Sequence, residues 1–291
     1  MFKKNIKLAK YAGFCYGVKR AVETAKKLKA ENPDKNICIL GELIHNTDVI
    51  KELESIGIKT IYSIPQKGSG ICIVRSHGEA PEVFDNLKNA GFEVVDLTCP
   101  DVKKVQQRAI ELAKNDYFVV IVGKPNHPEV IAIKANADLY SDNIAVATSI
   151  EELEPYKDMI KSHKRVGVVV QTTQMLSSLN NIVSYLNSIA KEIMIYNTIC
   201  QSTAMRQKEA KELAEESDLM IVVGSKKSAN TSHLAEILKN YTKTIHIEND
   251  SELKEYEGLL KEYNNIGITA GASTPQSVID NVILHIQKKE D

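Results

Sequence analysis

The sequence predicts an α/β protein whose fold repeats one unit three times. Short, continuous apolar stretches alternate with segments such as 18–28, in which apolar residues recur every three or four positions. Apolar stretches of this kind are typical of buried strands in parallel sheets that helices cover on both faces. The same order of helices and strands starts again at Cys15, Cys99 and Cys200.

The elements follow one another in a regular order within each unit. The first unit has expected helices at 18–30, 47–57 and 81–91, and strands at 36–41, 58–63, 69–78 and 92–99. The second has helices at 102–115 and 175–190 and one that opens in 126–130, with strands at 117–123, 144–148, 165–173 and 192–200. The third has helices at 204–217 and 275–287 and one that opens in 225–232, with strands at 218–224, 243–248 and 265–273.

The third unit lacks a closing strand, and the N-terminal segment 5–15 offers an unmatched one. The predicted domains are therefore residues 12–98, 99–199 and 200–291, the last completed by residues 1–11. A period of roughly 85–100 residues is too long for a solenoid, whose repeats are usually ~20–50 residues. We expect three small α/β domains with mainly parallel sheets, related by a pseudo-threefold axis around a central site.

The composition is that of an ordinary soluble globular protein, with 43% hydrophobic and 26% charged residues. The formal net charge of −1 lacks the basic excess that is typical of proteins that bind nucleic acid or anionic membranes. The N-terminal residues contain no signal-peptide core, and no apolar stretch approaches the ~20 residues of a membrane span. Five cysteines without an export signal favour a cytoplasmic protein whose thiols are free or bound to metal.

Polar loops follow most of the predicted strands. In parallel sheets, ligands bind beyond the carboxyl ends of strands, where helix N-termini present free N–H groups. Each side chain alone has a simpler explanation, such as an exposed imidazole, or a helix N-cap for Ser228, Asn230 and Ser273. Their recurrence at equivalent places favours a binding site. The loop residues are His45, His77, His127, Glu129, Gln171, Thr172, Thr173, Ser228, Asn230 and Ser273.

Three of the five cysteines occupy the same kind of position. Cys15, Cys99 and Cys200 each follow a predicted strand and precede a predicted helix, so the repeat predicts that the three thiols converge. Three thiolates suit a soft metal or an iron–sulfur cluster, and a cubane cluster with three protein ligands keeps one iron open. Cys38 and Cys72 lie within apolar strands and are interpreted as buried hydrophobic side chains.

One family has the same motifs in the same order. From Gly13 to about Pro275 the chain resembles the 4-hydroxy-3-methylbut-2-enyl diphosphate reductases in GFCYGVKRAV, LIHN, RSHG, LTCPDVKKV, HPEV, QTT, NTIC, SKKSAN and TAGAS. The resemblance implies reductive removal of the substrate's allylic hydroxyl as water, which gives isopentenyl and dimethylallyl diphosphates. It also implies reduced ferredoxin or flavodoxin as the electron donor.

The resemblance assigns roles to individual residues. It implies that Cys15, Cys99 and Cys200 ligate a [4Fe-4S] cluster whose open iron binds the substrate oxygen. Glu129 matches the catalytic proton donor, and Gln171, Thr173 and Thr203 match supporting positions. Residues implied to bind the substrate are His45, His77, His127, Thr172, Ser228, Ala229, Asn230 and Ser273, of which His127 and Thr172 also serve catalysis.

Two positions depart from the family's pattern. Ala229 stands where a second serine is common, so one hydroxyl contact to the diphosphate is missing, and Asn126 stands where a glycine is common. Two alternative functions also use a cluster: an enzyme similar to quinolinate synthase, and a redox sensor. The HPEV and QTT loops favour the reductase over the first, and the chain shows neither an output domain nor a basic face for the second.

Overall fold

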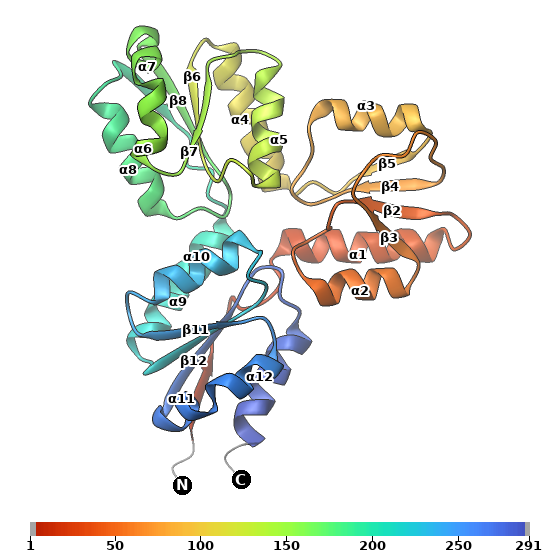
Figure 1. Cartoon of the computed structure of the whole chain (residues 1–291), viewed down its shortest axis with the longest axis vertical. Helices are drawn as coiled ribbons and strands as arrows, with labels where there is room; N and C mark the ends of the chain where they lie inside the picture. Colours follow the sequence, from red (N-terminus) through yellow and green to blue (C-terminus); the bar gives the residue numbers. More distant parts are fainter. Residues whose placement is uncertain (1–3, 289–291) are drawn as a thin grey trace. The chain divides into compact units, whose positions relative to one another are not determined.

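The structure is a computed structural model of the 291-residue chain and describes residues 4–288. Over that range strands alternate with helices, and the strands form three four-stranded sheets in which every pairing is parallel (Figure 1). The predicted α/β class with mainly parallel sheets is confirmed. No helix in the described range is both long and apolar enough to cross a membrane.

The described chain forms two compact units. The terminal unit contains residues 4–20, 44–52 and 201–288, and the central unit contains residues 21–43 and 53–200. Two helices, α1 (Tyr16–Glu31) and α2 (Thr47–Ser55), begin in the terminal unit and end in the central one. The terminal unit holds one sheet and the central unit holds two.

The sheet of the terminal unit has the strand order β1-β12-β10-β11. Its strands are β1 (Asn5–Leu8), β10 (Leu219–Val223), β11 (Lys243–Ile247) and β12 (Asn265–Ala270). Helices α9 (Gln201–Glu215) and α10 (Ala229–Leu238) pack on one face around Met220, and α12 (Gln276–Lys288), with η2 (Asp250–Tyr256) and α11 (Glu257–Glu262), packs on the other around Ile221. Because helices cover both faces, β10, one of the two central strands, is apolar at every position.

The first sheet of the central unit has the order β3-β2-β4-β5. Its strands are β2 (Ile37–Leu40), β3 (Ile58–Ile61), β4 (Ile71–Val74) and β5 (Glu93–Asp96). Helix α3 (Pro81–Ala90) packs on the face that carries Cys38 and Cys72, which are aligned in register on β2 and β4. Both cysteines lie in the middle of a strand within an apolar layer, as predicted.

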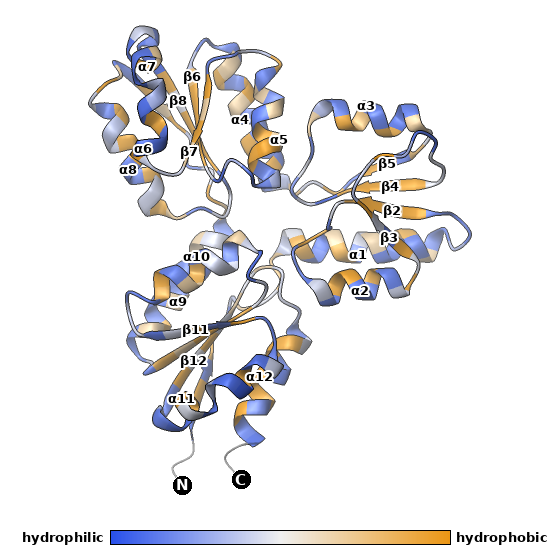
Figure 2. Ribbon diagram, in the orientation of Figure 1, coloured by the Kyte–Doolittle hydropathy of each residue, from blue (hydrophilic) through white to orange (hydrophobic). Residues whose placement is uncertain are grey.

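The second sheet of the central unit has the order β7-β6-β8-β9. Its strands are β6 (Phe118–Val122), β7 (Ile144–Ala147), β8 (Arg165–Val170) and β9 (Glu192–Ile195). One face is covered by α4 (Pro100–Lys114) and α5 (Pro128–Asp138), and the other by α6 (Ile150–Leu153), η1 (Glu154–Tyr156), α7 (Lys157–His163) and α8 (Leu176–Asn187). The hydrophobic strands and the hydrophilic outer sides of the helices are visible in Figure 2.

The three sheets share one topology. In the two sheets of the central unit, the strands numbered along the chain stand in the order second, first, third, fourth. The sheet of the terminal unit has the same order for β10, β11 and β12, and β1 takes the place of the fourth strand beside β12. The pairing joins Asn5 to Asn265 and Leu8 to Ile268. We retain the domain limits 12–98, 99–199 and 200–291 with 1–11 as a proposal for the three repeats.

The N-terminal strand is shorter than the sequence predicts. Segment 5–15 was expected to be extended up to Cys15, but β1 ends at Leu8 and the following residues are irregular. The peptide N–H groups of Lys10 and Tyr11 donate to a side-chain carboxylate instead of a neighbouring strand. Gly13 then takes a left-handed φ of +88°, which ends any extended path.

We expect Gly70→Ala to destabilise the central unit. Gly70 has a φ of +84°, and a Cβ atom there would overlap the carbonyl oxygen of Asn36, which accepts the N–H of Ile71 at 2.9 Å. The left-handed backbone and the clash together should cost roughly 1–3 kcal/mol. Thermal unfolding followed by circular dichroism measures this loss.

The matched control is Gly258→Ala in α11. A Cβ atom at Gly258 meets nothing within 4 Å, so this change should be neutral or slightly stabilising. Equal unfolding temperatures for the two variants would contradict the steric explanation at Gly70.

Candidate active site

The predicted site residues of the central unit lie beyond the carboxyl ends of its strands, in loops or in the first turn of the helix that follows. His77 follows β4, His127 and Glu129 follow β6, and Thr172 follows β8. Parallel pairing puts the ends of neighbouring strands at one edge of a sheet, which brings loops that are distant in sequence together. Glu129 and Thr172, which are 43 positions apart, meet in this way.

Glu129 is a buried carboxyl group held by one partner residue. Its side chain is 1% exposed and lies in the first turn of α5. The backbone N–H of Thr172 donates to Oε1 at 2.6 Å, and the hydroxyl of Thr172 bonds with Oε2 at 2.8 Å. Both oxygens of Glu129 are therefore fixed in direction, and the Thr172 hydroxyl is the atom through which a proton of Glu129 can leave.

Burial raises the pKa of the Glu129 carboxyl group to about 7. The hydrogen bonds from Thr172 act in the opposite direction because they stabilise the carboxylate, and the negative charge of Asp101 raises the pKa further. A carboxyl group with this pKa carries a proton in about half of the molecules at neutral pH and can act as a general acid. Sequence reasoning did not single out Asp101, because an acidic residue in the first turn of a helix is common for electrostatic reasons alone.

His127 is the N-cap of α5. Its Nδ1 atom accepts the backbone N–H of Glu129 at 3.2 Å, so a neutral ring carries its proton on Nε2. The ring of His77 lies edge-on to that of His127, with 5.5 Å between the ring centroids. The structure thus brings the rings of His77 and His127 together.

Gln171 and Thr173 support the loop that contains Thr172. The Gln171 side chain is fully buried, accepts the backbone N–H of Lys124 at 3.1 Å and donates to the Thr173 hydroxyl at 3.0 Å. It therefore ties the loop after β6 to the loop after β8. The supporting roles expected for Gln171 and Thr173 remain a prediction.

The three predicted metal ligands occupy equivalent local positions. Cys15, Cys99 and Cys200 come directly before α1, α4 and α9, and all three are partly exposed and outside any disulfide. Each backbone N–H donates to a loop carbonyl, that of Ala272, Ser76 and Thr172 respectively, and the last two bonds lie within the central unit.

The chemistry of these thiols fits an iron–sulfur cluster. The Cys15 sulfur accepts the backbone N–H of Val18 at 3.5 Å, at the start of α1. Cysteine thiolates are the usual protein ligands of iron–sulfur clusters. Cys38 and Cys72, in contrast, belong to an apolar cluster beneath α3.

In the terminal unit, Ser228, Ala229 and Asn230 form the start of α10 and are all nearly buried. Asn230 Oδ1 lies 3.4 Å from the Thr203 hydroxyl, whereas its Nδ2 has no hydrogen-bond partner in the described part of the chain. A buried amide donor without a partner costs free energy unless a ligand accepts from it. This donor and the free N–H groups of the helix suit an anion.

From the sequence, a helix N-cap was the simpler explanation for Ser228, Asn230 and Ser273. Only Ser228 occupies an N-cap position. Ser228 is the N-cap residue of α10, but its side chain makes no capping hydrogen bond. Asn230 lies inside the helix, and Ser273 lies three residues before α12 begins. The Ser273 hydroxyl instead donates to the carbonyl oxygen of His45 at 3.2 Å, which ties two predicted site loops of the terminal unit together.

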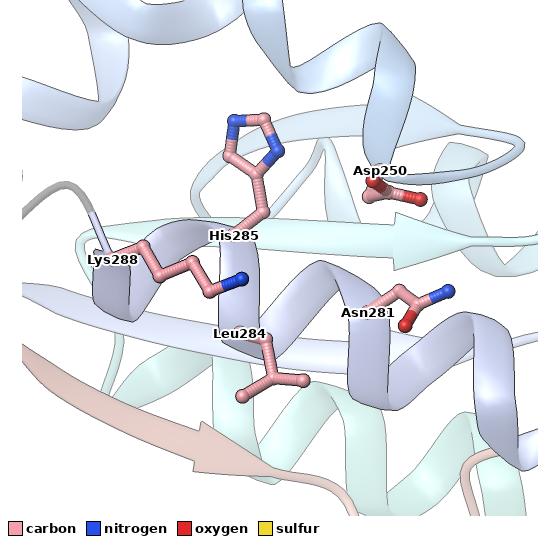
Figure 3. Close-up of a pocket in the computed structure, with 5 residues that line it drawn as sticks. All are labelled: Asp250, Asn281, Leu284, His285 and Lys288. Atoms are coloured by element: carbon pink, nitrogen blue, oxygen red, sulfur yellow. The ribbon is translucent and has the colours of Figure 1, made fainter.

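A groove of about 450 Å³ in the terminal unit lies outside the predicted site. It runs along α12 beside η2, and Figure 3 shows the side chains that line it. None of the predicted site residues is among them, and the lining carries one acidic residue beside one lysine and one histidine. The lining residues are Asp250, Asn281, Leu284, His285 and Lys288.

The chain matches known proteins along almost its whole length. The family model described as LytB protein matches residues 6–287. Relatives from Clostridium tetani, Pelobacter propionicus and Geobacter sulfurreducens are each 42% identical and cover 98%, 95% and 98% of this chain. All three are named 4-hydroxy-3-methylbut-2-enyl diphosphate reductase. The chain spans 44% of the length of the first relative and 95% and 97% of the other two.

Two solved structures have the same fold. One, described as (E)-4-hydroxy-3-methyl-but-2-enyl diphosphate reductase, the terminal enzyme of the non-mevalonate pathway, is 36% identical with a TM-score of 0.71 and covers 98% of this chain and 99% of its own. The other is the E-1-hydroxy-2-methyl-but-2-enyl-4-diphosphate reductase of Plasmodium falciparum, 27% identical with a TM-score of 0.87, covering 97% and 88%. The chain therefore belongs to the LytB protein family.

Proposed function

We propose that this chain reduces 4-hydroxy-3-methylbut-2-enyl diphosphate to isopentenyl diphosphate and dimethylallyl diphosphate. The allylic C–O bond breaks, two electrons and two protons are consumed, and the oxygen leaves as water. The observation that carries the proposal is the buried Glu129 carboxyl group, hydrogen-bonded to the Thr172 hydroxyl in a chain of the LytB family.

Membership of this family implies an iron–sulfur cluster. We assign it as a [4Fe-4S] cluster with Cys15, Cys99 and Cys200 as ligands and one iron open, which their matching positions before three helices support. When bound, the cluster would supply electrons singly and an iron that acts as a Lewis acid. Reduced ferredoxin or flavodoxin is the electron donor, and five cysteines outside disulfides agree with a reducing, cytoplasmic setting.

Glu129 and Thr172 deliver a proton to the leaving group. Hydroxide is a poor leaving group, so protonation of the substrate oxygen lowers the barrier to breaking the C–O bond. The Thr172 hydroxyl lies 2.8 Å from Glu129 Oε2, to which it donates when the carboxyl group is ionised. When Glu129 carries the proton, this hydroxyl accepts it and passes its own proton to the substrate oxygen. The backbone bond from the Thr172 N–H then stabilises the carboxylate that remains.

Neutral donors bind the diphosphate. His127 carries its ring proton on Nε2, because Nδ1 accepts the Glu129 N–H, and His77 packs against the same ring. From the terminal unit we assign Ser228, Ala229 and Asn230 at the start of α10 to the same ligand. We also assign His45 and Ser273, whose loops are joined by the hydrogen bond from the Ser273 hydroxyl to the His45 carbonyl oxygen. At Ala229 only the backbone N–H can donate, and hydrogen bonds of this kind to an anion are strong.

The two alternative functions that use a cluster have less support. The three relatives described above are all named 4-hydroxy-3-methylbut-2-enyl diphosphate reductase, and none of them is named as a quinolinate synthase or a sensor. The carboxyl–hydroxyl pair of Glu129 and Thr172 is also suited to protonating a leaving hydroxyl, a task that a sensor does not have.

The proposed function is tested by an anaerobic assay. The chain is reconstituted with iron and sulfide, reduced chemically and mixed with 4-hydroxy-3-methylbut-2-enyl diphosphate. We expect a cluster absorbance and both isoprenoid diphosphates as products. A cluster without product would favour one of the alternative functions, and the absence of any cluster would overturn the assignment of the three thiols.

We expect Glu129→Gln to keep the cluster and to lose about 10²- to 10⁴-fold in turnover, because glutamine cannot donate an acidic proton. In the unaltered chain, turnover should fall as the pH rises above about 7, since the Glu129 carboxyl group, with its pKa of about 7, loses its proton there. Steady-state rates across pH and the cluster absorbance measure both effects.

The pH dependence of the free energy of unfolding gives an independent measure of the raised pKa of Glu129. Glu129 keeps its proton in the folded state up to a pH of about 7, whereas an unfolded glutamate releases it near 4.5. The folded state binds more protons in that interval, so the free energy of unfolding should fall by up to about 3 kcal/mol as the pH rises through it. Glu129→Gln should lack this loss, and a parallel decline in both proteins would contradict the raised pKa.

Cys99→Ser should abolish both the cluster and the activity, because a serine hydroxyl is a poor ligand for iron at neutral pH. The matched control is Cys38→Ser, at a cysteine that is also partly exposed but lies within β2. Iron and sulfide analysis after reconstitution compares the two. Equal loss of iron from both variants would show that the assignment of the ligands is wrong.

A further inference from the structure

The loop that leads to Cys15 is hydrogen-bonded to a buried arginine of helix α9. The Arg206 side chain is 3% exposed and extends from α9 to the irregular segment after β1. Its guanidinium group donates to the carbonyl oxygens of Tyr11, Gly13 (2.9 Å) and Ala270 (2.8 Å). Two stretches from opposite ends of the chain are thus attached to one planar group, whose fork of N–H donors can hold several acceptors at fixed angles.

Glu209 also holds this segment, but it accepts hydrogen bonds where Arg206 donates them. It lies three residues after Arg206, on the same side of α9. Its two carboxylate oxygens accept the backbone N–H groups of Lys10 (2.6 Å) and Tyr11 (2.8 Å). One face of the helix therefore accepts from the N–H groups of this segment and donates to its carbonyls, which replaces the strand pairing that the segment lacks.

The path from this attachment to the Cys15 sulfur is short and tightly bent. Gly13 has a φ of +88°, and a Cβ atom there would lie 3.2 Å from Ile279 Cδ1. Two residues later, the Cys15 N–H donates to the carbonyl of Ala272 at 3.2 Å, and Val18 N–H donates to the sulfur. No residue between β1 and α1 belongs to a regular element, so these contacts set the position of the sulfur.

We propose that Arg206 and Glu209 are positioning residues for Cys15 as a metal ligand. The inference rests on the proposed function, since it presumes that Cys15 binds the cluster. The pair keeps the thiol in one place before iron arrives, so that ligation costs little ordering of the loop. Arg206 acts through the backbone of Tyr11 and Gly13, and it is not itself a ligand.

The first test measures the apoprotein, so it does not depend on turnover. Arg206→Gln removes the charge and most of the donors, and Glu209→Gln keeps one acceptor oxygen. We expect the rate of Cys15 alkylation by iodoacetamide, followed by peptide mass spectrometry, to rise about tenfold in the first and less in the second, because hydrogen bonds to charged groups are lost. Cys99 in the same samples should react at an unchanged rate.

The matched control is Lys208→Gln on the same helix. The Lys208 side chain is 79% exposed and pairs with Glu212, so this change removes a positive charge without touching the Cys15 loop. It should leave the alkylation rate unchanged. Arg206→Lys, which keeps the charge but not the planar fork, should restore only part of the protection.

The second test uses the reconstituted protein. In Arg206→Gln the cluster should be lost to an iron chelator about tenfold faster, and the electron paramagnetic resonance spectrum of the reduced cluster should differ from that of the unaltered chain. Unchanged alkylation and chelation in Arg206→Gln would overturn the inference alone. If Arg206→Gln unfolds, Cys99 will also react faster. In that case the rates of Cys15 alkylation and of cluster loss in Glu209→Gln test the inference instead. An unaltered chain that binds no iron would instead overturn the proposed function.

Discussion

Parallel strand pairing is the constraint on which the rest of this structure depends. In each sheet the carboxyl ends of the strands meet at one edge, so residues that are far apart in sequence enter the same small region. Glu129 meets Thr172 because β6 and β8 are neighbours, and Ser273 meets the His45 carbonyl in the terminal unit. The loops at that edge are in turn joined by hydrogen bonds such as those of Gln171, which link the loop after β6 to the loop after β8.

The acid chemistry follows from a balance between two effects at one carboxyl group. Burial opposes the charge of Glu129, and two hydrogen bonds from Thr172 stabilise it. Burial alone would keep the proton too firmly, and the hydrogen bonds alone would release it at a lower pH than that at which an exposed glutamate does. The result is a pKa of about 7, at which the group can both hold and give a proton under physiological conditions.

The repeat and the candidate ligands could be predicted because they leave a strong signal in sequence. Buried parallel strands are continuous apolar stretches, and Cys15, Cys99 and Cys200 stand out by their shared place before a helix. Pairwise contacts could not be predicted in this way. Nothing in the local sequence indicates that His127 caps α5 through Nδ1, or that Arg206 lies buried, since both are usually polar surface residues. These details depend on which loops the tertiary fold brings together.

The use of β1 as the fourth strand of the last sheet has a consequence for assembly. β1 pairs with β12, roughly 260 positions later, and the segment after it is held by α9 and by the carbonyl oxygen of Ala272, which accepts the N–H of Cys15. During synthesis the chain emerges from its N-terminus, so Cys15 is made early but the contacts that fix it are made last. Contacts of such long sequence separation also form slowly. The Cys15 thiol is therefore placed only when almost the whole chain has been made, whereas the backbone bonds of Cys99 and Cys200 lie within residues 76–200.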